Sequence, residues 1–408
     1  MKINSTHIDT WRNRALKLEA ESFNNSVKPE TSKIPPLFPI GQVAEKIGIS
    51  KTMLIRTLNE FPDIPYEIVG KNTRKFSPEG ISKIREALNK KNPKRYPSGK
   101  LEKGVVVSIS NQKGGVGKTT TAVNLAAYLA LYGGSIQNNE DEGYRSEHKI
   151  LVIDLDPQSS TTAQFGFGDG LEIEKTSYAL LTPNEEDVPE DITSLPLKTN
   201  FHNIDIIPSS LELTNADFEI PVRRIEDEDF NFYEILKHRI EELKNHYTCI
   251  IIDSPPSLNF SSFNIAAASD AIIIPMICSQ ASFHSLVSYL SMLTDVTSLL
   301  ETVDMEEGEQ REINLKKIKV VANMFKNDKD NMDIVSKIQQ VFGEDFLPTP
   351  ILQSAIFEQA VNEHKNIYEL TNIRSRETYN RCLDSFNAFG SEVSSIINEI
   401  SIPLLELE

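Results

Sequence analysis

The residues best suited to chemistry form a glycine-rich loop, SNQKGGVGKTTT, at positions 110–121. In a loop that opens a helix, backbone N–H groups can receive phosphate oxygens, a lysine can offset phosphate charge, and a threonine hydroxyl can bind Mg²⁺. The usual phosphate-binding pattern starts with a glycine at the position where this chain has Gln112, and an additional lysine, Lys113, follows it. The candidate nucleotide-binding residues are Gly114, Gly115, Val116, Gly117, Lys118, Thr119 and Thr120.

Aspartates follow two apolar runs that are typical of buried strands. KILVIDLDPQSS contains Asp154 and Asp156, and YTCIIIDSPPS contains Asp253. Because the carboxyl ends of strands line the ligand crevice of an open parallel sheet, we expect these carboxylates beside the glycine loop. There they could hold a magnesium-bound water.

The elements that must position these residues follow from short β-branched runs that alternate with helical segments. The runs are VVVSIS, KILVID, IDIIP, CIIID, AIIIP and IKVVAN. This alternation predicts an α/β fold, a parallel sheet with helices on both faces. VVVSIS leads directly into the glycine loop, and TTAVNLAAYLALY continues as a helix, which is the context that a phosphate loop requires. The acidic segments 135–148 and 182–194 are expected to be solvated surface loops.

The charge of the chain is divided unevenly. The net charge of the 408 residues is −17, but residues 1–103 contain 20 Lys and Arg against 11 Asp and Glu, a balance of +9. Residues 104–408 have a balance of −26. A basic N-terminal module on an acidic body points to a nucleic-acid partner, with an ordinary solvated face as the alternative.

The segment FPIGQVAEKIGISKTMLIRTLNEF (38–61) has the pattern of a helix-turn-helix. Its two apolar sets are separated by Gly48, and Ser50 is placed to cap the second helix. The hairpin-like YEIVGKNTRKF (66–76) has the size of a wing, and Ser77 is placed to cap a further helix. The candidate DNA-binding residues are Lys51, Thr52, Arg56, Lys71, Arg74 and Lys75.

These features divide the chain into four parts. Residues 1–34 hold an amphipathic helix at 7–23 and a linker, and this helix could serve self-association or dock on its own chain. Residues 35–92 are expected to form the winged helix-turn-helix, residues 93–103 a basic, proline-containing linker, and residues 104–408 the domain that contains the glycine loop.

Composition narrows the class of protein. The three cysteines form no CxxC pair, which disfavours a metal site and favours reduced thiols. No apolar run approaches the roughly 20 residues of a bilayer span, and the N-terminus lacks the apolar core of a signal peptide. A cytoplasmic protein is expected.

QKGGVGKTT, DLDPQSS and DSPPS together resemble the deviant Walker ATPases, and within them the ParA family of DNA partition proteins. The resemblance covers nearly all of residues 104–400, including IIPSSLEL, ANMF and ETYNRCLDSFNAFGSEV. The long members of this family carry an N-terminal winged helix-turn-helix. The fold that the resemblance implies is a parallel-sheet P-loop (deviant Walker) ATPase domain behind an N-terminal helix and a winged helix-turn-helix.

The resemblance also implies residue roles. Members form a nucleotide-sandwich homodimer in which the early lysine, here Lys113, reaches the phosphates held by the other subunit. Lys118 and Asp156 complete the catalytic set, with Asp156 orienting the attacking water, and Asn323 contacts adenine. Mg²⁺ is supported by Thr119, Asp154 and Asp253.

The implied function is a DNA-partition ATPase that uses ATP/ADP and Mg²⁺. In the ATP state it binds DNA nonspecifically at the nucleoid, it is stimulated by a ParB-like centromere-binding protein, and it represses its own operon. Higher-order assembly is a further implication. The family's arginines after the last strand are missing from PTPILQSAIFEQA, so other cations must contact nonspecific DNA. The candidates are Lys316, Lys317, Lys326, Lys329, Arg374, Arg376 and Arg381.

Other classes fit less well. A membrane-positioning ATPase like MinD would end in a basic amphipathic helix, whereas this sequence ends in NEISIPLLELE, so no membrane partner is expected. An iron–sulfur carrier would need paired cysteines, and a small-molecule ligase would not use a winged helix. The main alternative is a transcriptional regulator that uses ATP/ADP as a conformational switch with little hydrolysis. The joint presence of both lysines and the three aspartates favours hydrolysis.

Overall fold

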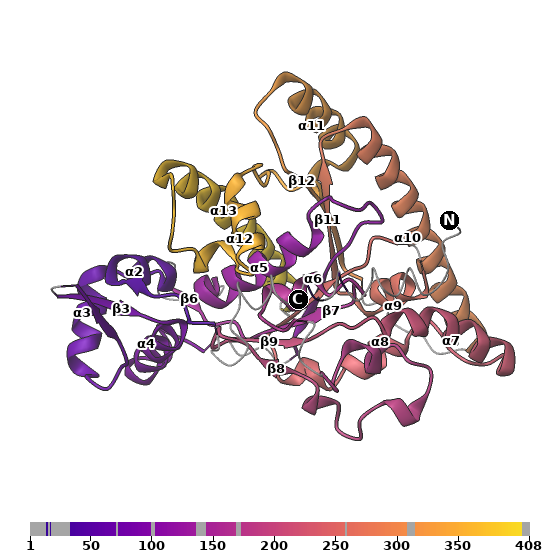
Figure 1. Ribbon diagram of the computed structural model, residues 1–408, viewed down its shortest axis with the longest axis horizontal. Coiled ribbons are helices and arrows are strands. Elements are labelled where there is room, and N and C mark those ends of the chain that lie inside the picture. The colour runs from indigo at the N-terminus through magenta and orange to yellow at the C-terminus, as the bar shows by residue number, and fades with distance from the viewer. Residues whose placement is uncertain are drawn as a thin grey trace, which may run out of the picture.

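The computed structural model describes Arg14, Lys17 and residues 33–70, 72–98, 103–135, 144–168, 173–257, 259–307 and 315–401. Apart from Arg14 and Lys17, the helix expected at 7–23 lies outside these residues. Lys71 does as well. In Figure 1 the first described elements form a lobe at one side of a larger α/β body.

Seven strands form the central sheet of the body, in the order β12-β11-β4-β10-β7-β9-β8. All neighbours pair in parallel except β8, which is antiparallel to β9. The six predicted strands are confirmed, whereas the two-residue edge strand β8 leaves no pattern in the sequence. The strands are β4 (Val105–Ile109), β7 (Ile150–Asp154), β8 (Leu197–Lys198), β9 (Ile204–Ile207), β10 (Cys249–Asp253), β11 (Ala271–Ile277) and β12 (Lys317–Asn323).

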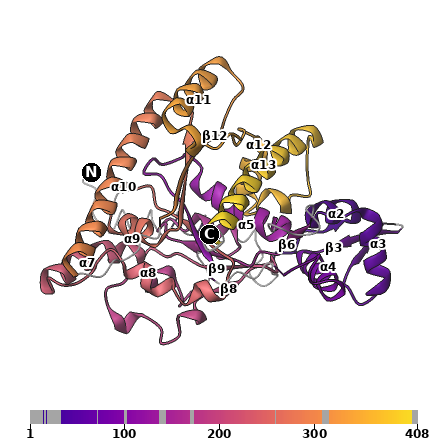
Figure 2. The ribbon, with the colours of Figure 1, turned by 180° about the vertical axis from the view of Figure 1, so that it is seen from behind.

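Helices cover both faces of this sheet, as predicted (Figures 1 and 2). The helices are α5 (Lys118–Tyr132), α6 (Ser160–Gln164), α7 (Leu213–Glu226), α8 (Ile235–Ile240), α9 (Phe260–Ala268), α10 (Gln280–Glu307), α11 (Lys329–Phe342), α12 (Ala355–Asn362) and α13 (Arg376–Ser401). Shorter elements are β5 (Gly134–Ser135), β6 (Arg145–Ser146), η1 (Ser177–Leu180), η2 (Glu185–Asp187), η3 (Ile192–Ser194), η4 (Leu243–Asn245), η5 (Gly343–Asp345) and η6 (Ile367–Glu369). One hydrophobic cluster joins the sheet to α5 and α13, and a second joins it to α7, α8 and α9.

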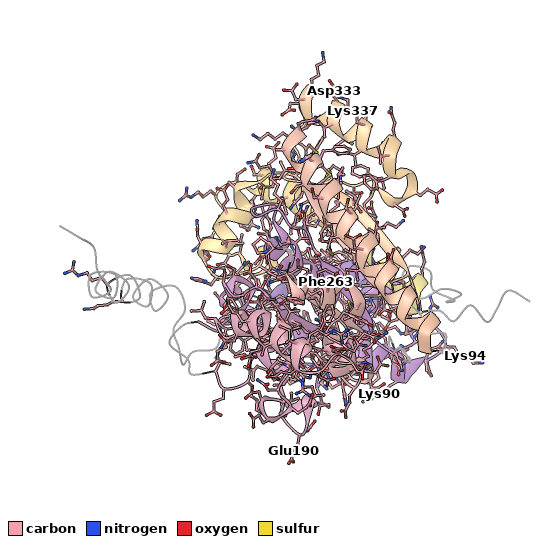
Figure 3. The ribbon with its side chains drawn as sticks, turned by 90° about the vertical axis from the view of Figure 1, so that its right-hand side faces the viewer. Lys90, Lys94, Glu190, Phe263, Asp333 and Lys337 are labelled. Carbon is pink, nitrogen blue, oxygen red and sulfur yellow. The ribbon has the colours of Figure 1, made fainter. Side chains whose placement is uncertain are left out.

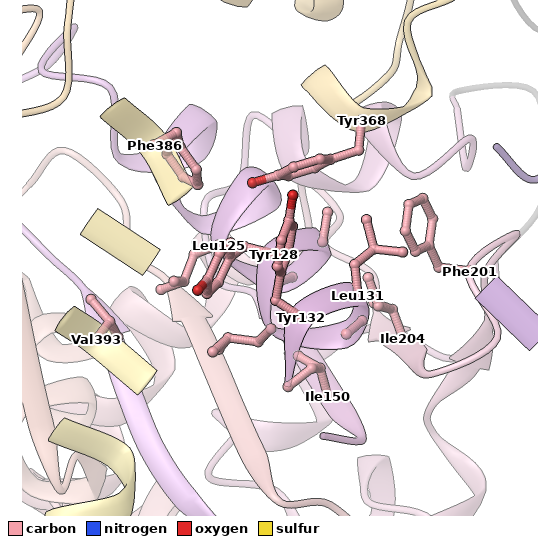
Figure 4. Packing of buried hydrophobic residues seen from close by; sticks show 14 of the residues in the cluster. Leu125, Tyr128, Leu131, Tyr132, Ile150, Phe201, Ile204, Tyr368, Phe386 and Val393 are labelled. Carbon is pink, nitrogen blue, oxygen red and sulfur yellow. The ribbon is translucent and has the colours of Figure 1, made fainter. Parts of the chain in front are cut away.

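Helix α5, which follows the glycine loop, is buried along most of its length. Its residues Tyr128 and Tyr132 stack with ring centroids 4.8 Å apart. Figure 4 shows them packed near Tyr368 and Phe386, which come from the C-terminal part of the chain. The burial fixes α5, so the loop at its N-terminus is held on a rigid element.

The N-terminal lobe contains three helices and a small sheet in the order β1-β3-β2. Its elements are β1 (Phe38–Pro39), α2 (Ile40–Ile47), α3 (Lys51–Glu60), β2 (Glu67–Val69), β3 (Thr73–Phe76) and α4 (Pro78–Lys91). Gly48, between α2 and α3, has φ of 76°, a left-handed conformation that favours glycine. The expected caps are present, because Ser50 Oγ accepts from Met53 N and Ser77 Oγ accepts from Gly80 N.

The lobe packs on the C-terminal end of α5. Lys46 of α2 is buried, and its ammonium lies 4.0 Å from the ring centroid of Tyr132. Arg85 of α4, also buried, donates to the carbonyl of Leu131. The hydrophobic cluster of the lobe is continuous with that of α5. The lobe and the body are therefore in firm contact.

The expectation for one surface segment needs correction. The segment 135–148 was expected to be a solvated loop, but at its described end Tyr144, Ser146 and His148 are buried. Tyr96, in the segment 93–103 that we interpret as a linker, is also buried, and its ring packs edge-on against Tyr144 with centroids 5.1 Å apart. Both segments supply packing between the lobe and the body.

In Figure 1 α11 lies at the top of the body beside the upper end of α10, and α10 runs down from there to the side opposite the lobe, near α7. Figure 3 shows Asp333 and Lys337 projecting from α11 at the tip of the molecule, with Glu190 at the opposite end. None of the helices in the described part of the chain is long and apolar enough to cross a membrane.

Candidate functional site

The glycine loop (residues 111–117) connects β4 to α5 at the carboxyl edge of the sheet. Gly115 and Gly117 have φ of 73° and 86°, conformations that side chains rarely adopt. A Cβ on Gly117 would also collide with the amide nitrogen of Asn323. The loop therefore needs glycine at position 117 for two reasons, and its backbone is shaped to approach a ligand.

Lys118 is the first residue of α5, and its side chain folds back along the loop. Its Nζ donates to the carbonyl of Lys113 at 3.3 Å, and only 6% of the residue is exposed. Burial lowers the pKa of Lys118, and the charges of Asp253 and Asp156 partly oppose this effect. A buried ammonium held against the backbone of the loop is suited to a multiply charged anion.

Asp253 ends β10, the strand between β4 and β7. Its Oδ2 accepts from the hydroxyls of Thr119 at 2.8 Å and Thr161 at 2.7 Å. Its Oδ1 is buried and has no hydrogen-bond partner. A buried carboxylate oxygen without a partner is costly unless a cation or a donor arrives. Asp253 and Thr119 therefore fit one side of a Mg²⁺ site.

Asp154 ends β7 and pairs in register with Asp253. Its Oδ2 accepts from the backbone N and the hydroxyl of Thr162, at 2.8 and 2.7 Å, and its Oδ1 accepts from Asp156 N at 3.1 Å. Burial and the neighbouring charge of Asp253 raise the pKa of Asp154 well above its ordinary value. Both oxygens of Asp154 are thus engaged by the protein, whereas Asp253 keeps one open.

Asp156 lies beyond the end of β7, in the turn before α6. It is half-buried, and its Oδ1 accepts from Gln158 N at 3.0 Å. The carbonyl of Asp156 accepts from the Ser209 hydroxyl at 2.7 Å, which ties this turn to the segment after β9. Asp156 is therefore more accessible than Asp154 or Asp253, and its position in the turn is fixed.

Lys113 points toward α10. Its Nζ donates to the hydroxyl of Ser282 at 2.9 Å, in the first turn of that helix. Gln112 makes a parallel contact, from its amide Nε2 to the carbonyl of Ser285 at 2.9 Å. The side chain of Lys113 therefore contacts α10, whereas its carbonyl accepts from Lys118.

A pocket of about 350 Å³ opens beside the loop. Asn323, at the end of β12, forms part of its wall and donates from Nδ2 to the carbonyl of Val116 at 2.6 Å. The other wall residues are Gly117, Thr120, Thr121, Met324, Ile351, Leu352, Gln353, Ser354, Phe357, Glu358, Val361, Asn362 and Phe386. The mixture of apolar and amide groups suits a flat heterocycle with polar edges.

The predicted DNA-binding residues other than Lys71 belong to α3 and β3 of the N-terminal lobe. Lys51, Thr52 and Arg56 of α3 are exposed, and so is Arg74 of β3. Arg56 is paired with Glu60 at 3.1 Å, and the guanidinium carbon of Arg74 lies 4.8 Å from the centroid of the Tyr66 ring. Lys75 is half-buried. Of the cations proposed for nonspecific binding, Lys317 pairs with Glu399 at 3.3 Å and the others are exposed.

Sequence reasoning missed several residues of this site. Thr161 donates to the buried Asp253, and Thr162 donates to the buried Asp154. Because both threonines directly follow DLDPQSS, their position in the sequence could have predicted a role at this site. Ser282 contacts Lys113, but nothing in the sequence around it indicates this. The pocket wall at 351–357 was also not predicted. It lies within PTPILQSAIFEQA, the segment that lacks the arginines of the ParA family.

Comparison with known proteins agrees with this geometry. Residues 104–305 match the family model described as an AAA domain. The sporulation initiation inhibitor protein Soj of Bacillus subtilis is 34% identical over 205 residues, 50% of this chain and 71% of that protein. A Sinorhizobium fredii protein that carries the name replication protein A is 25% identical over 383 residues, 91% of this chain and 88% of its own length.

One solved structure extends the likeness to nearly the whole chain. A structure described as a partition protein has a TM-score of 0.64 and 20% identity, and the match covers 96% of this chain and 98% of that one. At this identity the likeness speaks for the fold alone. Soj is 34% identical and 71% of its length is covered, and on this evidence the chain belongs to the ParA/Soj-type family of partition ATPases.

Proposed function

We propose that this chain binds and hydrolyses ATP, dimerises with ATP between its subunits, and moves a plasmid or other replicon by binding DNA. The observation that carries this proposal is the different fate of two lysines in one loop. Lys118 is buried in the cradle, whereas Lys113 extends from it to Ser282. One lysine suffices for the phosphates of the same subunit. A second cation at the mouth of the loop is useful when another subunit faces it.

The residues around the cradle supply the chemistry of hydrolysis. Backbone N–H groups of the loop and Lys118 would hold the phosphates, and the pocket beside Asn323 would take the base. Mg²⁺, when bound, would offset the charge that develops on the phosphates. Thr119 and Asp253 would hold it, because the Asp253 carboxylate accepts from the Thr119 hydroxyl through Oδ2 and keeps its Oδ1 open.

Asp156 is the proposed water-orienting residue. Its carboxylate is half-buried and outside the pair of fully buried aspartates, so it can meet a water without first losing a structural hydroxyl contact. Asp154 then supports the site indirectly, since both of its oxygens are held by Thr162 and Asp156 N. We therefore propose that Asp154 supports the Mg²⁺ site through its neighbour Asp253 and is not itself a ligand.

The N-terminal lobe is the proposed operator-binding domain, a winged helix-turn-helix with α3 as the recognition helix and the β2-β3 hairpin as the wing. Its exposed cations, on an otherwise acidic protein, support this assignment. The ATPase body would bind DNA without sequence preference in the ATP state, as a homodimer or higher assembly. A ParB-like protein would stimulate turnover. We propose a cytoplasmic, nucleoid-associated protein that represses its own operon.

The packing of the lobe on α5 also favours a second function. A transcriptional regulator that uses ATP and ADP as a switch would need the nucleotide site linked to the DNA-binding lobe. Helix α5 starts at the glycine loop and ends against Arg85 and Lys46 of the lobe. Slow or absent turnover in the presence of bulk DNA and the partner protein would favour this alternative.

Light scattering of Lys113→Ala with Mg²⁺ and ATP tests the main proposal. We expect this variant to bind ADP with parental affinity and to remain monomeric with ATP, because its missing cation serves the other subunit. Lys118→Ala is the matched lysine removal inside the cradle, and it should lose nucleotide binding itself. A Lys113→Ala protein that dimerises and hydrolyses ATP like the parent would refute the sandwich arrangement.

A further inference from the structure

The hydrogen bond from Lys113 Nζ to Ser282 Oγ, here called the cis contact, joins two parts of the chain 169 residues apart. Ser282 is fully buried, and its hydroxyl also lies 2.9 Å from that of Ser279. Ser279 precedes α10 and accepts from Ser282 N at 3.3 Å, as a helix-capping serine does. The hydroxyl that receives Lys113 is therefore fixed in place by the start of α10.

Gln112 strengthens this connection. Its amide donates to the carbonyl of Ser285, one turn along the same helix. Asn111, the first residue of the loop, donates to the carbonyl of Pro275 in β11, the strand that leads to α10. The three residues that precede the glycines are thus all held by β11 and α10.

The cis contact is a poor resting place for a cation. Its acceptor is a neutral hydroxyl, and none of the ion pairs among the described residues includes Lys113. The N-terminus of a helix also carries a partial positive charge, which disfavours an ammonium at that position. Phosphate oxygens would offer Lys113 a charged acceptor, and charge-assisted hydrogen bonds are roughly twice as strong as neutral ones.

We propose that Ser282 is a positioning residue that retains Lys113 within its own subunit until a nucleotide-loaded second subunit is presented. The inference rests on the proposed function, because it assumes that Lys113 acts on the partner's phosphates. Dimerisation then requires the cis contact to break in both subunits. Because each dimer contains two such contacts, the free-energy cost of breaking the contact is incurred twice. Dimers therefore form at higher concentrations of ATP and of protein than they would without the contact.

Release of Lys113 also changes α10. The Ser282 hydroxyl loses its charged donor, while the first turn of α10 keeps only the Gln112 contact from the loop. Helix α10 comprises Gln280–Glu307 and runs from the top of the body, beside α11, down the side opposite the lobe (Figure 1). The cis contact therefore joins Lys113 to the first turn of a helix that spans this side of the molecule.

The test measures the dimer dissociation constant of the full chain by sedimentation, with Mg²⁺ and a non-hydrolysable ATP analogue. Ser282→Ala should lower this constant about a hundredfold, because two hydrogen bonds to a charged group no longer oppose association. Ser282→Thr keeps the hydroxyl and should stay near the parent. Ser288→Ala, which removes an exposed hydroxyl from the same helix, should also match the parent. ADP affinity should be unchanged in all three, which also shows that they fold.

One result would overturn the inference while leaving the proposed function intact. It is a parental dissociation constant for Ser282→Ala in a protein whose Lys113→Ala variant stays monomeric. Parental dimerisation of Lys113→Ala alone would instead refute the proposed sandwich, and the inference with it.

Discussion

The guanidinium of Arg85 donates from Nη2 to the carbonyl of Leu131 at 2.8 Å, and this bond joins α4 of the N-terminal lobe to the last turn of α5. The same side chain donates to the carbonyls of Lys46 at 3.3 Å and Arg145 at 3.1 Å. Arg85 is buried, and burial lowers its pKa. One side chain thus satisfies carbonyl groups from the end of α2, the end of α5 and strand β6, which makes it the polar centre of the contact between lobe and body.

Arg85→Ala should destabilise the protein by about 3 kcal/mol, because it leaves three carbonyls without their donor in a buried contact. Thermal unfolding followed by circular dichroism measures this loss. Lys83→Ala is the matched control, since Lys83 is on the same helix but pairs at the surface with Glu86. Equal melting temperatures for the two variants would show that the lobe and the body do not depend on Arg85.

Asp156→Ala should bind ATP and DNA normally and lose turnover, because only the proposed water-orienting carboxylate is removed. We expect its dimer then to persist with ATP, as we expect of the parent with a non-hydrolysable analogue. Phosphate release under single-turnover conditions measures the effect. Asp187→Ala, an exposed carboxylate far from the loop in the fold, is the control. Parental hydrolysis by Asp156→Ala would move the catalytic role to another residue.

Asp253 should make the nucleotide-free protein less stable as the pH rises. Burial raises the pKa of Asp253 to about 6 in the folded chain, so the folded state binds its proton more tightly than the unfolded state does. The stabilisation of the folded state by this bound proton is complete below about pH 4, the ordinary pKa of an aspartate. It is lost as the pH rises through about 6.

Asp253→Asn removes this titration. Its melting temperature without nucleotide should exceed that of the parent by roughly 5 °C at pH 7.5 and by little at pH 4.5. Asp229→Asn, at an exposed position, controls for the loss of one negative charge. A constant difference at both pH values would contradict the assigned cause. The same variant should lose Mg²⁺-dependent hydrolysis, so stability and activity change in opposite directions.

The parts of the fold that the sequence predicts are those set by neighbouring residues. Six strands, the caps at Ser50 and Ser77 and the glycine turn at Gly48 all depend on local periodicity and backbone preference. The placement of Asp154 and Asp253 at one edge also follows, because parallel strands bring their carboxyl ends together. These two aspartates are in register in the sheet.

The remainder depends on contacts between distant segments. Ser282 meets Lys113 across 169 residues, and Arg85 meets Leu131 across 46, with no periodic signal at either end. The burial of Tyr144 and His148 was missed because the acidic residues before them dominate the composition of their segment. The pocket beside the glycine loop draws its wall from β12, α12 and α13 as well as from the loop, and no single stretch of sequence shows this.

The last prediction separates two modes of DNA binding. The exposed face of α3 carries Lys51 and Arg56, while Leu54 and Leu58 on its other face are buried in the lobe. Replacing Lys51 and Arg56 by alanine should therefore spare the fold. Base-edge contacts contribute about 1–3 kcal/mol each, and a dimer repeats every loss at two half-sites. Operator binding should fall steeply, whereas ATP-dependent binding to random DNA should survive, because we assign it to the body.

Gel shifts on the region upstream of the operon and on scrambled DNA, with and without ATP and at two salt concentrations, measure both modes. The control is Lys83→Ala with Lys90→Ala, which removes the same charge from α4 of the same lobe. This control should change both modes only slightly, through the general salt-dependent attraction to phosphates. If the α3 variant loses operator and random DNA binding to the same extent, the lobe and the body share one DNA surface, and the assignment of sequence-specific binding to α3 alone is wrong.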